Sequence, residues 1–478
     1  MKDLLIMTRL ILIFNIIFLL GFVLFSKKSQ NQNIIWVPAS LTMFLTVIML
    51  PVLIDANHRL STRSILASIT LFMLMLLLVN KDIRYKKNKL MIPAFFLILN
   101  LYILITYETF KRLVQLTPDT YAYIFIARSI NSSEGLNDIN QGTLLLRGLN
   151  LPILLAIFQE SYTPYVLPSI IVILNFITVY GFCKEFEILK KPVNYLELIA
   201  LSLIFITTLQ GFYLLFYVTT HGIVSLSILL YFGTVIKYKL RSEDITSTDH
   251  LIKLVSLVTL ALIRPEGIIL SVLMILFSFQ YLNQDYKYLR IHLYPILLLL
   301  TYWFFSLYSL EPTERTLFAS YLFGCVFILS IIYVELFVKR KRNFAVKILN
   351  SILILLLFSS IIFTWKLLIT NISACLKLSL LNEGGLGFVP ILMLVTYFYV
   401  SIREKHSNKI LMNLSLTGIA LTYLIIPVLN GNQWICGSAG WGDTIARSYN
   451  HFIILFGFGF LVRKIIQMDS KLTFQKLS

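Results

Sequence analysis

Long apolar runs alternate with short polar segments along the whole chain. Runs of about 20 apolar residues recur, and a helix of that length crosses a hydrocarbon core of ~30 Å. The first run, LLIMTRLILIFNIIFLLGFVLF, is too long for the apolar part of a signal peptide and has no small-residue cleavage site behind it. The pattern therefore predicts membrane-spanning helices, beginning with this run.

Composition agrees with this pattern. Hydrophobic residues make up 58% of the 478 positions and charged residues 13%, and the mean hydropathy is +0.82. The formal charge of +18 comes from Lys and Arg that cluster in short loops between apolar runs, as in membrane proteins and unlike a nucleic-acid groove. We therefore predict an all-α polytopic integral membrane protein whose partners include membrane lipids and no nucleic acid.

The basic loops predict the topology, because cytoplasmic loops carry an excess of Lys and Arg. The span at 90–108 runs outward, so residues 109–162 form the longest external loop. We place in the cytoplasm the segments 80–89, 184–191, 237–241, 339–342 and 403–409 and the tail from Arg463. The later external loops are 310–315, 369–385 and 430–449.

Residues 251–282 form one apolar run, yet basic segments at 237–241 and 287–290 flank both of its ends. We expect two short helices that meet at Arg264-Pro265-Glu266-Gly267, where Pro and Gly interrupt the helix and two charges reach the external surface. The alternative is one long, kinked span in which the Arg264 side chain extends to the headgroups.

The apolar runs amount to about 13 to 15 spans. Basic residues flank both ends of one early span, so the orientation is least defined before residue 62. We divide the chain into N-terminal spans at 1–89, a core at 90–290 that contains the loop 109–162, and C-terminal spans at 291–478. No separate soluble domain is expected, because the longest polar stretch is too short to bury a core of its own.

The stretch LTPDTYAYIFIARSI, residues 116–130, predicts a helix at the start of the external loop. Pro118 suits the first turn, and the carboxylate of Asp119 is favoured there by the helix dipole. Asp119, Tyr123 and Ala127 are spaced four residues apart and share one face. The remaining aromatic and aliphatic residues predict a helix that lies flat on the membrane surface. A second apolar helix of about ten residues follows in LLLRGLNLPILLAIF; it is too short to span and is expected on the surface or partly inserted.

The order of residues in this loop resembles a known family. An acid, a Tyr four residues later, Ala-Arg, a Gly-containing turn and Arg-Gly before a Pro-Leu-rich helix are similar to the C superfamily of polytopic glycosyltransferases, which includes lipid A aminoarabinose transferases and protein O-mannosyltransferases. The segment LALIRPEGIIL resembles the family's Leu-x-Arg-Pro-Glu-Gly hairpin, and ARSYNHFIILFGFGF, at 446–460, resembles the Arg-Tyr that opens a late span. The resemblance covers roughly residues 90–290. The matching loop residues are Asp119, Tyr123, Ala127, Arg128, Gly135, Arg147, Gly148 and Pro152.

The resemblance implies an enzyme that takes a sugar from a polyprenyl-phosphate carrier and transfers it to a hydroxyl of a glycan, lipid or protein. Its site would face the external, periplasmic side of a bacterial cell membrane. A hydroxyl needs a general base, which would be Asp119, and single displacement would invert the anomeric centre. Guanidinium groups stabilise a leaving phosphate, a role for Arg147, Arg264 and Arg447. The weaker candidates for substrate binding are Arg128, Glu266, His221, Tyr123 and Tyr449.

Two departures from the family pattern affect the expected cofactors. Thr120 stands where several relatives carry a second acid, and Asn150-Leu151-Pro152 stands where the family has a proline pair. A lone acid puts in doubt a metal role that two adjacent acids would support, so the sequence leaves a divalent cation open. The four cysteines have no CxxC spacing and predict no metal site.

Each candidate also has a purely structural alternative. A carboxylate in the first turn of a helix is stabilised by ~0.3–1 kcal/mol without any catalytic role. The three arginines can each anchor a span at the headgroups. His221, at the outer end of a span, is better explained as a surface histidine than as a ligand.

Two other classes of function fit the composition. A flippase or transporter of lipid-linked sugars predicts charges buried within spans and broken helices at related positions of two halves, whereas the spans here are poor in charge. A polysaccharide polymerase or ligase usually has its essential external loop late in the chain, whereas the loop 109–162 is early.

Overall fold

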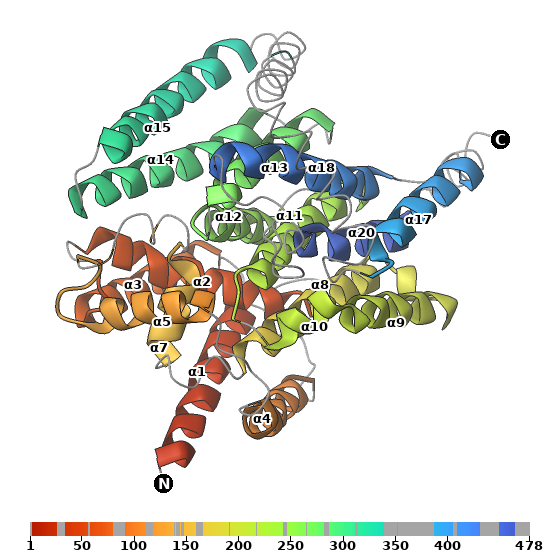
Figure 1. The fold of residues 1–478 in the computed structure, drawn as a ribbon, viewed down its shortest axis with the longest axis horizontal. Coiled ribbons are helices and arrows are strands. Elements are labelled where there is room, and N and C mark those ends of the chain that lie inside the picture. The colour runs from red at the N-terminus through yellow and green to blue at the C-terminus, as the bar shows by residue number, and fades with distance from the viewer. Residues whose placement is uncertain are drawn as a thin grey trace. The chain divides into compact units, whose positions relative to one another are not determined.

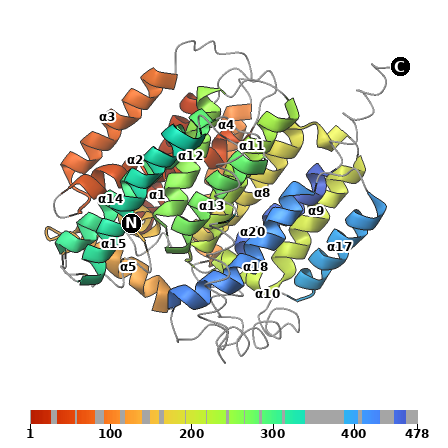
Figure 2. The same ribbon diagram turned by 90° about the horizontal axis from the view of Figure 1, so that it is seen from above.

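The structure is a computed structural model, and its described residues are helical wherever they form regular structure, with no strand. Figure 1 shows the helices coloured from red at the N-terminus to blue at the C-terminus, and Figure 2 shows them from above. The all-α prediction is therefore confirmed. The described residues are 2–25, 34–55, 58–79, 91–110, 118–137, 139, 144, 148–158, 166–190, 192–216, 218–241, 246–263, 265–281, 286–310, 314–338, 351, 387–404, 409–430 and 449–463.

The chain folds into two compact units. The first unit comprises Met1–Leu174, Phe216–Thr220 and Ser242–Val346. The second comprises Asn175–Leu215, His221–Arg241 and Lys347–Ser478.

The first unit is built around α2 (Trp36–Ile54), which packs against α1, α3, α7 and α12. This helix is apolar on all sides, and a helix of that kind is stable only when it is buried. Gly21 lets the backbones of α1 and α2 approach each other, because a Cβ at Gly21 would lie 1.6 Å from Ser40 Oγ of α2. The other helices of the unit are α1 (Lys2–Phe25), α3 (Thr62–Val79), α4 (Met91–Phe110), α5 (Pro118–Asn131), α7 (Asn150–Phe158), the first part of α8 (Leu167–Glu185), α12 (Ser247–Ala261), α13 (Pro265–Tyr281), α14 (Tyr286–Leu310), α15 (Glu314–Ile332) and η3 (Tyr333–Val338).

The second unit is centred on α20 (Asn450–Val462), which packs against α9, α11 and α18. Its residues are almost all buried, and the Phe452 ring occupies the space that a side chain at Gly418 would need. The other elements are the end of α8, η2 (Ile188–Lys190), α9 (Pro192–Thr207), α10 (Leu209–Phe216), α11 (His221–Arg241), α17 (Val389–Arg403) and α18 (Ile410–Asn430).

Four stretches of the described helices are long and apolar enough to cross a membrane, namely Met7–Leu24, Trp36–Ile54, Leu167–Glu185 and Tyr288–Ser309. Several shorter helices also expose large apolar side chains, such as Ile402 of α17, which is 73% exposed. The protein is thus a polytopic membrane protein. The full number of 13 to 15 spans remains a prediction.

The predicted break within residues 251–282 is confirmed. The helix α12 ends at Ala261 and α13 begins at Pro265. The two helices pack against each other, since Ser271 Oγ donates a hydrogen bond to Leu257 O at 3.2 Å and a Cβ at Gly267 would lie 1.9 Å from Leu260 O. These contacts exclude the alternative of one long span, because a continuous helix cannot fold back on itself.

Contacts within each unit agree with the alternation of predicted loops. In the second unit, Lys237 Nζ lies 3.0 Å from Glu185 Oε1, and Arg463 Nε lies 3.3 Å from Glu404 Oε1. Each pair joins two segments that the basic loops placed on one side. The Phe182 and Phe458 rings, 5.8 Å apart, lie near the same ends of α8 and α20.

In the first unit, the backbone of the loop before α3 joins the end of α5. Leu60 N donates a hydrogen bond to Ile130 O at 2.8 Å, and Arg59 Nη1 donates one to Ser133 O at 3.3 Å. The segment around residue 60 therefore lies on the same side as α5. This contact orients the part of the chain whose loop charges were least informative.

Candidate functional site

The helix α5 begins at Pro118, as the sequence predicted, and directs one face inward. Tyr123 is 2% exposed and Ala127 is 0% exposed, so two members of the predicted face are buried together. Tyr121 and Phe125 are more than half exposed on another face, where aromatic rings suit a headgroup zone. Arg128 is exposed as well, away from the buried face.

The helix α7 packs against α5, α1 and α2, and Figure 1 shows α5 and α7 close together. Asn131, the last residue of α5, donates a hydrogen bond from Nδ2 to Ala156 O at 2.9 Å. Eight of the nine residues of α7 are buried. The prediction of a short apolar helix is confirmed, and neighbouring helices cover it on nearly every side. Whether it lies on the membrane surface or is partly inserted stays a prediction.

The segment before α7 is held against the turn between α12 and α13. Gly148 has a φ of +64°, and a Cβ there would lie 2.2 Å from Ile263 O. Leu149 N donates a hydrogen bond to Leu262 O at 3.3 Å, and Asn150 Nδ2 donates one to Thr259 O at 2.5 Å. Only a glycine tolerates this conformation at so short a distance from another backbone. Gly148 and Leu149 of the loop therefore contact Leu262 and Ile263, the two residues that directly precede the Arg-Pro-Glu-Gly turn.

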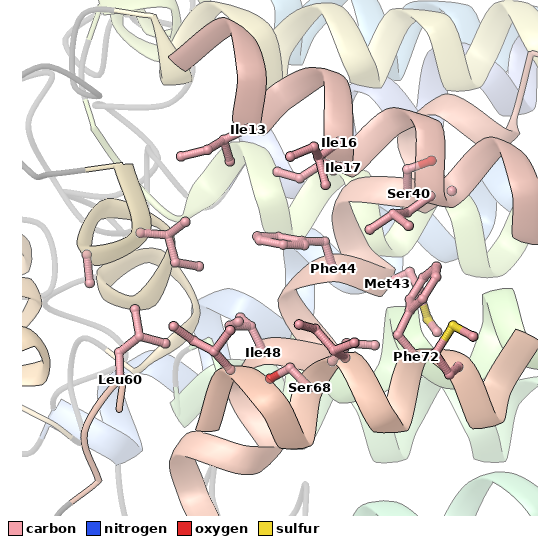
Figure 3. A pocket seen from close by; sticks show the side chains of 18 of the residues that line it. Ile13, Ile16, Ile17, Ser40, Met43, Phe44, Ile48, Leu60, Ser68 and Phe72 are labelled. Carbon is pink, nitrogen blue, oxygen red and sulfur yellow. The ribbon is translucent and has the colours of Figure 1, made fainter. Parts of the chain in front are cut away.

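A cavity of about 750 Å³ lies between α1, α2 and α3 and extends to the ends of α5 and α7. Figure 3 shows Ile13, Ile17, Phe44 and Phe72 around this space. Other lining residues, such as Ile69, are about half exposed, so the cavity opens at the flank of the helices. It is a space suited to an apolar chain.

The polar groups of the cavity wall are few. Ser68 Oγ donates a hydrogen bond to Ser64 O at 2.7 Å, and Ser40 is bonded in the same way to Trp36 O, so both hydroxyls are satisfied within their own helices. Arg9 is the charged residue of the wall, and its Nη2 lies 3.5 Å from Ile157 O at the end of α7. The guanidinium is exposed and therefore available to an anion beside the apolar space.

The loop between α2 and α3 adds titratable groups near the end of α5. His58 is 3% exposed, and its Nδ1 lies 3.2 Å from Val52 O. Burial, partly offset by this carbonyl and by Asp55, lowers the pKa of His58 below its ordinary value. Arg59 Nε lies 3.8 Å from Asp55 Oδ1. The sequence analysis used Arg59 only as a basic residue beside an early span, and it did not single out Arg9 or His58. A basic residue inside the first apolar run was the available signal for Arg9.

In the second unit, His221 is 2% exposed, and its Nδ1 lies 2.8 Å from His451 Nε2. The expectation of a surface histidine is therefore wrong, because α20 covers the first turn of α11. Tyr449 is 8% exposed and directly precedes α20. The segment that begins at Tyr449 therefore contacts His221 through His451. The sequence analysis missed His451, although it stands in the same late motif.

The remaining candidates lie outside what the structure describes. These are Arg147, Arg264 and Arg447 as whole residues, and the side chains of Asp119 and Glu266, whose backbones begin α5 and α13. Within the described ranges, no group of three or more His, Cys, Asp or Glu side chains is arranged to hold a metal ion. The divalent cation that the sequence left open is therefore still untested.

Comparisons with known proteins yielded no matching family model, no similar curated protein and no similar solved structure.

Proposed function

We propose that the protein is a membrane glycosyltransferase that moves a sugar from a polyprenyl-phosphate carrier to an acceptor hydroxyl on the side of the membrane that carries α5 and α7. The observation that carries the proposal is the apolar cavity between α1, α2 and α3, which ends at these two helices. An apolar chain gains ~25 cal/mol for each Å² that it buries, so such a cavity favours an isoprenoid or acyl chain. Arg9 at the wall supplies a partner for the anionic group of such a lipid.

The motif residues supply the chemistry in this proposal. Asp119 takes the proton of the acceptor hydroxyl, and Arg147 and Arg264 stabilise the negative charge on the leaving phosphate. Support for a joint action of the two arginines comes from their neighbours, since Gly148 and Leu149 contact Ile263 and Leu262. A divalent cation at the phosphate would add charge stabilisation, and nothing in the described residues assigns it ligands.

In this proposal the lipid chain binds near one end of α5, and the sugar transfer takes place near the other end. Asp119 and Asn131 are twelve residues apart in one helix, which corresponds to ~18 Å along its axis. Asn131 lines the cavity, whereas Asp119 stands at the opposite end of the helix. A polyprenyl chain is long enough to bridge this separation, so changes at the cavity affect the KM for the donor and changes at Asp119 affect kcat.

The test measures sugar transfer from a series of polyprenyl-phosphate sugars by membranes that contain the wild type or Asp119→Asn. Because Asn cannot accept the proton, kcat should fall by roughly 100-fold or more at unchanged donor KM. Glu187→Gln removes an exposed carboxylate from the turn after α8 and should leave both constants unchanged. Full activity of Asp119→Asn removes Asp119 as the base, and absence of transfer by the wild type with every donor favours a transporter of lipid-linked sugars.

A further inference from the structure

A cluster of basic and aromatic side chains lies between α12 and α14, within the first unit. His250 Nδ1 lies 3.3 Å from His292 Nε2, and their rings are stacked at 5.5 Å. Tyr288 packs against His292 at a ring distance of 4.6 Å, and Lys253 Nζ lies 4.9 Å above the centre of the Tyr288 ring. We call His250, Lys253, Tyr288 and His292 the basic cluster.

The basic cluster is almost completely buried. Lys253 is 1% exposed, Tyr288 is 3% exposed and His292 is 0% exposed, whereas His250 is partly exposed. The sequence predicted spans that are poor in charge, and Lys253 departs from this prediction. An ammonium group in such a position is retained in proteins only where something compensates its lost hydration.

The described residues provide this compensation only in part, through the Tyr288 ring beneath the ammonium and the charge of Asp249. Lys253 Nζ and His292 Nδ1 are both buried and have no hydrogen-bond partner there. The nearest acid in the sequence, Asp249, uses its Oδ2 for the N-terminal cap of α12, at 3.2 Å from Thr246 N and 2.7 Å from Thr246 Oγ1. On α14, Arg290 Nε is paired with Glu335 Oε1 at 2.9 Å. The cluster therefore has two buried nitrogens without hydrogen-bond partners and a positive charge that its neighbours offset only in part.

The chemistry of the cluster selects an anion with several acceptor oxygens. A cation is excluded by the ammonium of Lys253, and a neutral apolar ligand leaves both nitrogens unsatisfied. A phosphate group offers oxygens in several directions and binds Lys strongly as a point charge. We propose that the basic cluster binds a phosphate-type anion, with Lys253 and His292 as its inner donors and the partly exposed His250 on the path of entry.

This site is separate from the candidate functional site. His250 and Leu262 are twelve residues apart along α12 and the residue that follows it, which corresponds to ~18 Å. Leu262 contacts Leu149 beside α7, so the basic cluster lies at the opposite end of α12, on the predicted cytoplasmic side. The proposal goes beyond glycosyl transfer and does not require it.

The experiment uses the full chain in phosphatidylcholine nanodiscs. Inorganic phosphate is titrated at constant ionic strength, and the unfolding temperature is measured, because a ligand that binds the folded state raises it. The wild type should show a saturable rise. Lys253→Met retains the length of the side chain without its charge and should weaken the apparent phosphate affinity roughly 10-fold or more. His292→Phe retains the ring and should also weaken the response.

A second arm distinguishes the two sources of phosphate. Nanodiscs that contain phosphatidic acid, without free phosphate, test whether a lipid headgroup occupies the site. A rise that depends on Lys253 in either arm supports the proposal and identifies the source. Lys184→Met, an exposed lysine of α8, and Asp119→Asn should keep the wild-type response, so failure of the proposed transferase function does not affect this result. No rise in either arm, or an undiminished rise in Lys253→Met, overturns the proposal.

Discussion

The cavity between α1, α2 and α3 and the basic cluster between α12 and α14 differ in the kind of ligand that each would favour. The cavity has an apolar wall whose two serine hydroxyls are satisfied within their own helices and one charge at its edge. The basic cluster has two buried nitrogens without partners. Apolar burial is non-directional and gains affinity gradually with area, whereas a buried charge requires an opposite charge, hydrogen-bond partners or an aromatic face at a defined position. If both proposals hold, the area of the cavity determines how much of a lipid is bound, and the cluster determines the charge of its ligand.

The largest effect is expected when the contact that holds α7 at the end of the cavity is disrupted and the basic cluster is left unchanged. Gly148→Ala adds a Cβ 2.2 Å from Ile263 O at a φ of +64°, so we expect a loss of about 2–5 kcal/mol in stability and displacement of α7 from the cavity wall. Thermal unfolding of purified protein measures the loss. Gly324→Ala is the matched control, because the nearest atom to its Cβ is 3.9 Å away. Equal unfolding temperatures for the two variants would show that the contact with Ile263 is not required.

The second test removes the charge of the cluster in the absence of phosphate. Lys253→Met replaces a buried ammonium, whose lost hydration destabilises the folded state, by an apolar chain of similar length. We therefore expect a higher unfolding temperature in phosphate-free buffer. Lys184→Met, at an exposed position, should change stability by less than about 0.5 kcal/mol. A destabilised Lys253→Met would contradict this expectation and would mean that the Tyr288 ring and Asp249 outweigh the lost hydration of the ammonium.

The third test fills the cavity. Ser68 lines the cavity, and its side chain is labelled in Figure 3. Ser68→Phe places a ring in the space of the lipid chain, so the donor KM should rise by roughly 10-fold, equivalent to about 1.4 kcal/mol of lost binding. The measurement is the transfer assay over a range of donor concentrations. Thr70→Phe, on an exposed part of the same helix, should leave KM unchanged.

The fourth test concerns pH and the loop beside the cavity. The pKa of His58 is lowered in the folded protein, mainly by burial, so the unfolded chain binds the proton more tightly. Stability should therefore be constant above the ordinary pKa of ~6.5 and fall below it, by at most about 1.4 kcal/mol for each pH unit. His58→Asn keeps a residue that accepts the observed φ of +49° and should reduce the fall between pH 7.5 and pH 5.5. An unchanged pH profile in this variant would contradict the assignment.

The smallest effect is expected at the edge of the cavity. Arg9 is exposed, so solvent screens its attraction for an anionic lipid. Arg9→Met should raise the donor KM by roughly two- to fivefold without a change in kcat. Arg63→Met removes another exposed guanidinium, from the first turn of α3, and should have no effect on KM. A fall in kcat in Arg9→Met would place this residue in the chemistry instead.

Residues close together in the sequence were sufficient to predict where α5 and α13 begin and that α7 is short. Pro118 and Pro265 begin α5 and α13 as predicted, because proline fits the first turn of a helix and cannot continue an earlier one. The length of the apolar run before Phe158 correctly predicted a helix too short to span. The grouping of basic loops also agreed with ion pairs such as Lys237–Glu185, since one charge rule applies to every loop.

The sequence by itself determined the helical membrane fold, the break at Pro265 and the start of α5, because each depends on residues within one or two turns. The tertiary structure alone decided that α7 and His221 are buried, that Gly148 meets Ile263, and that Lys253 lies beside His292. These outcomes join residues that lie far apart in the chain, and periodicity within one helix does not specify which other helix covers its face. The apolar cavity and the basic cluster therefore appear only when α1, α2 and α3, or α12 and α14, are packed together.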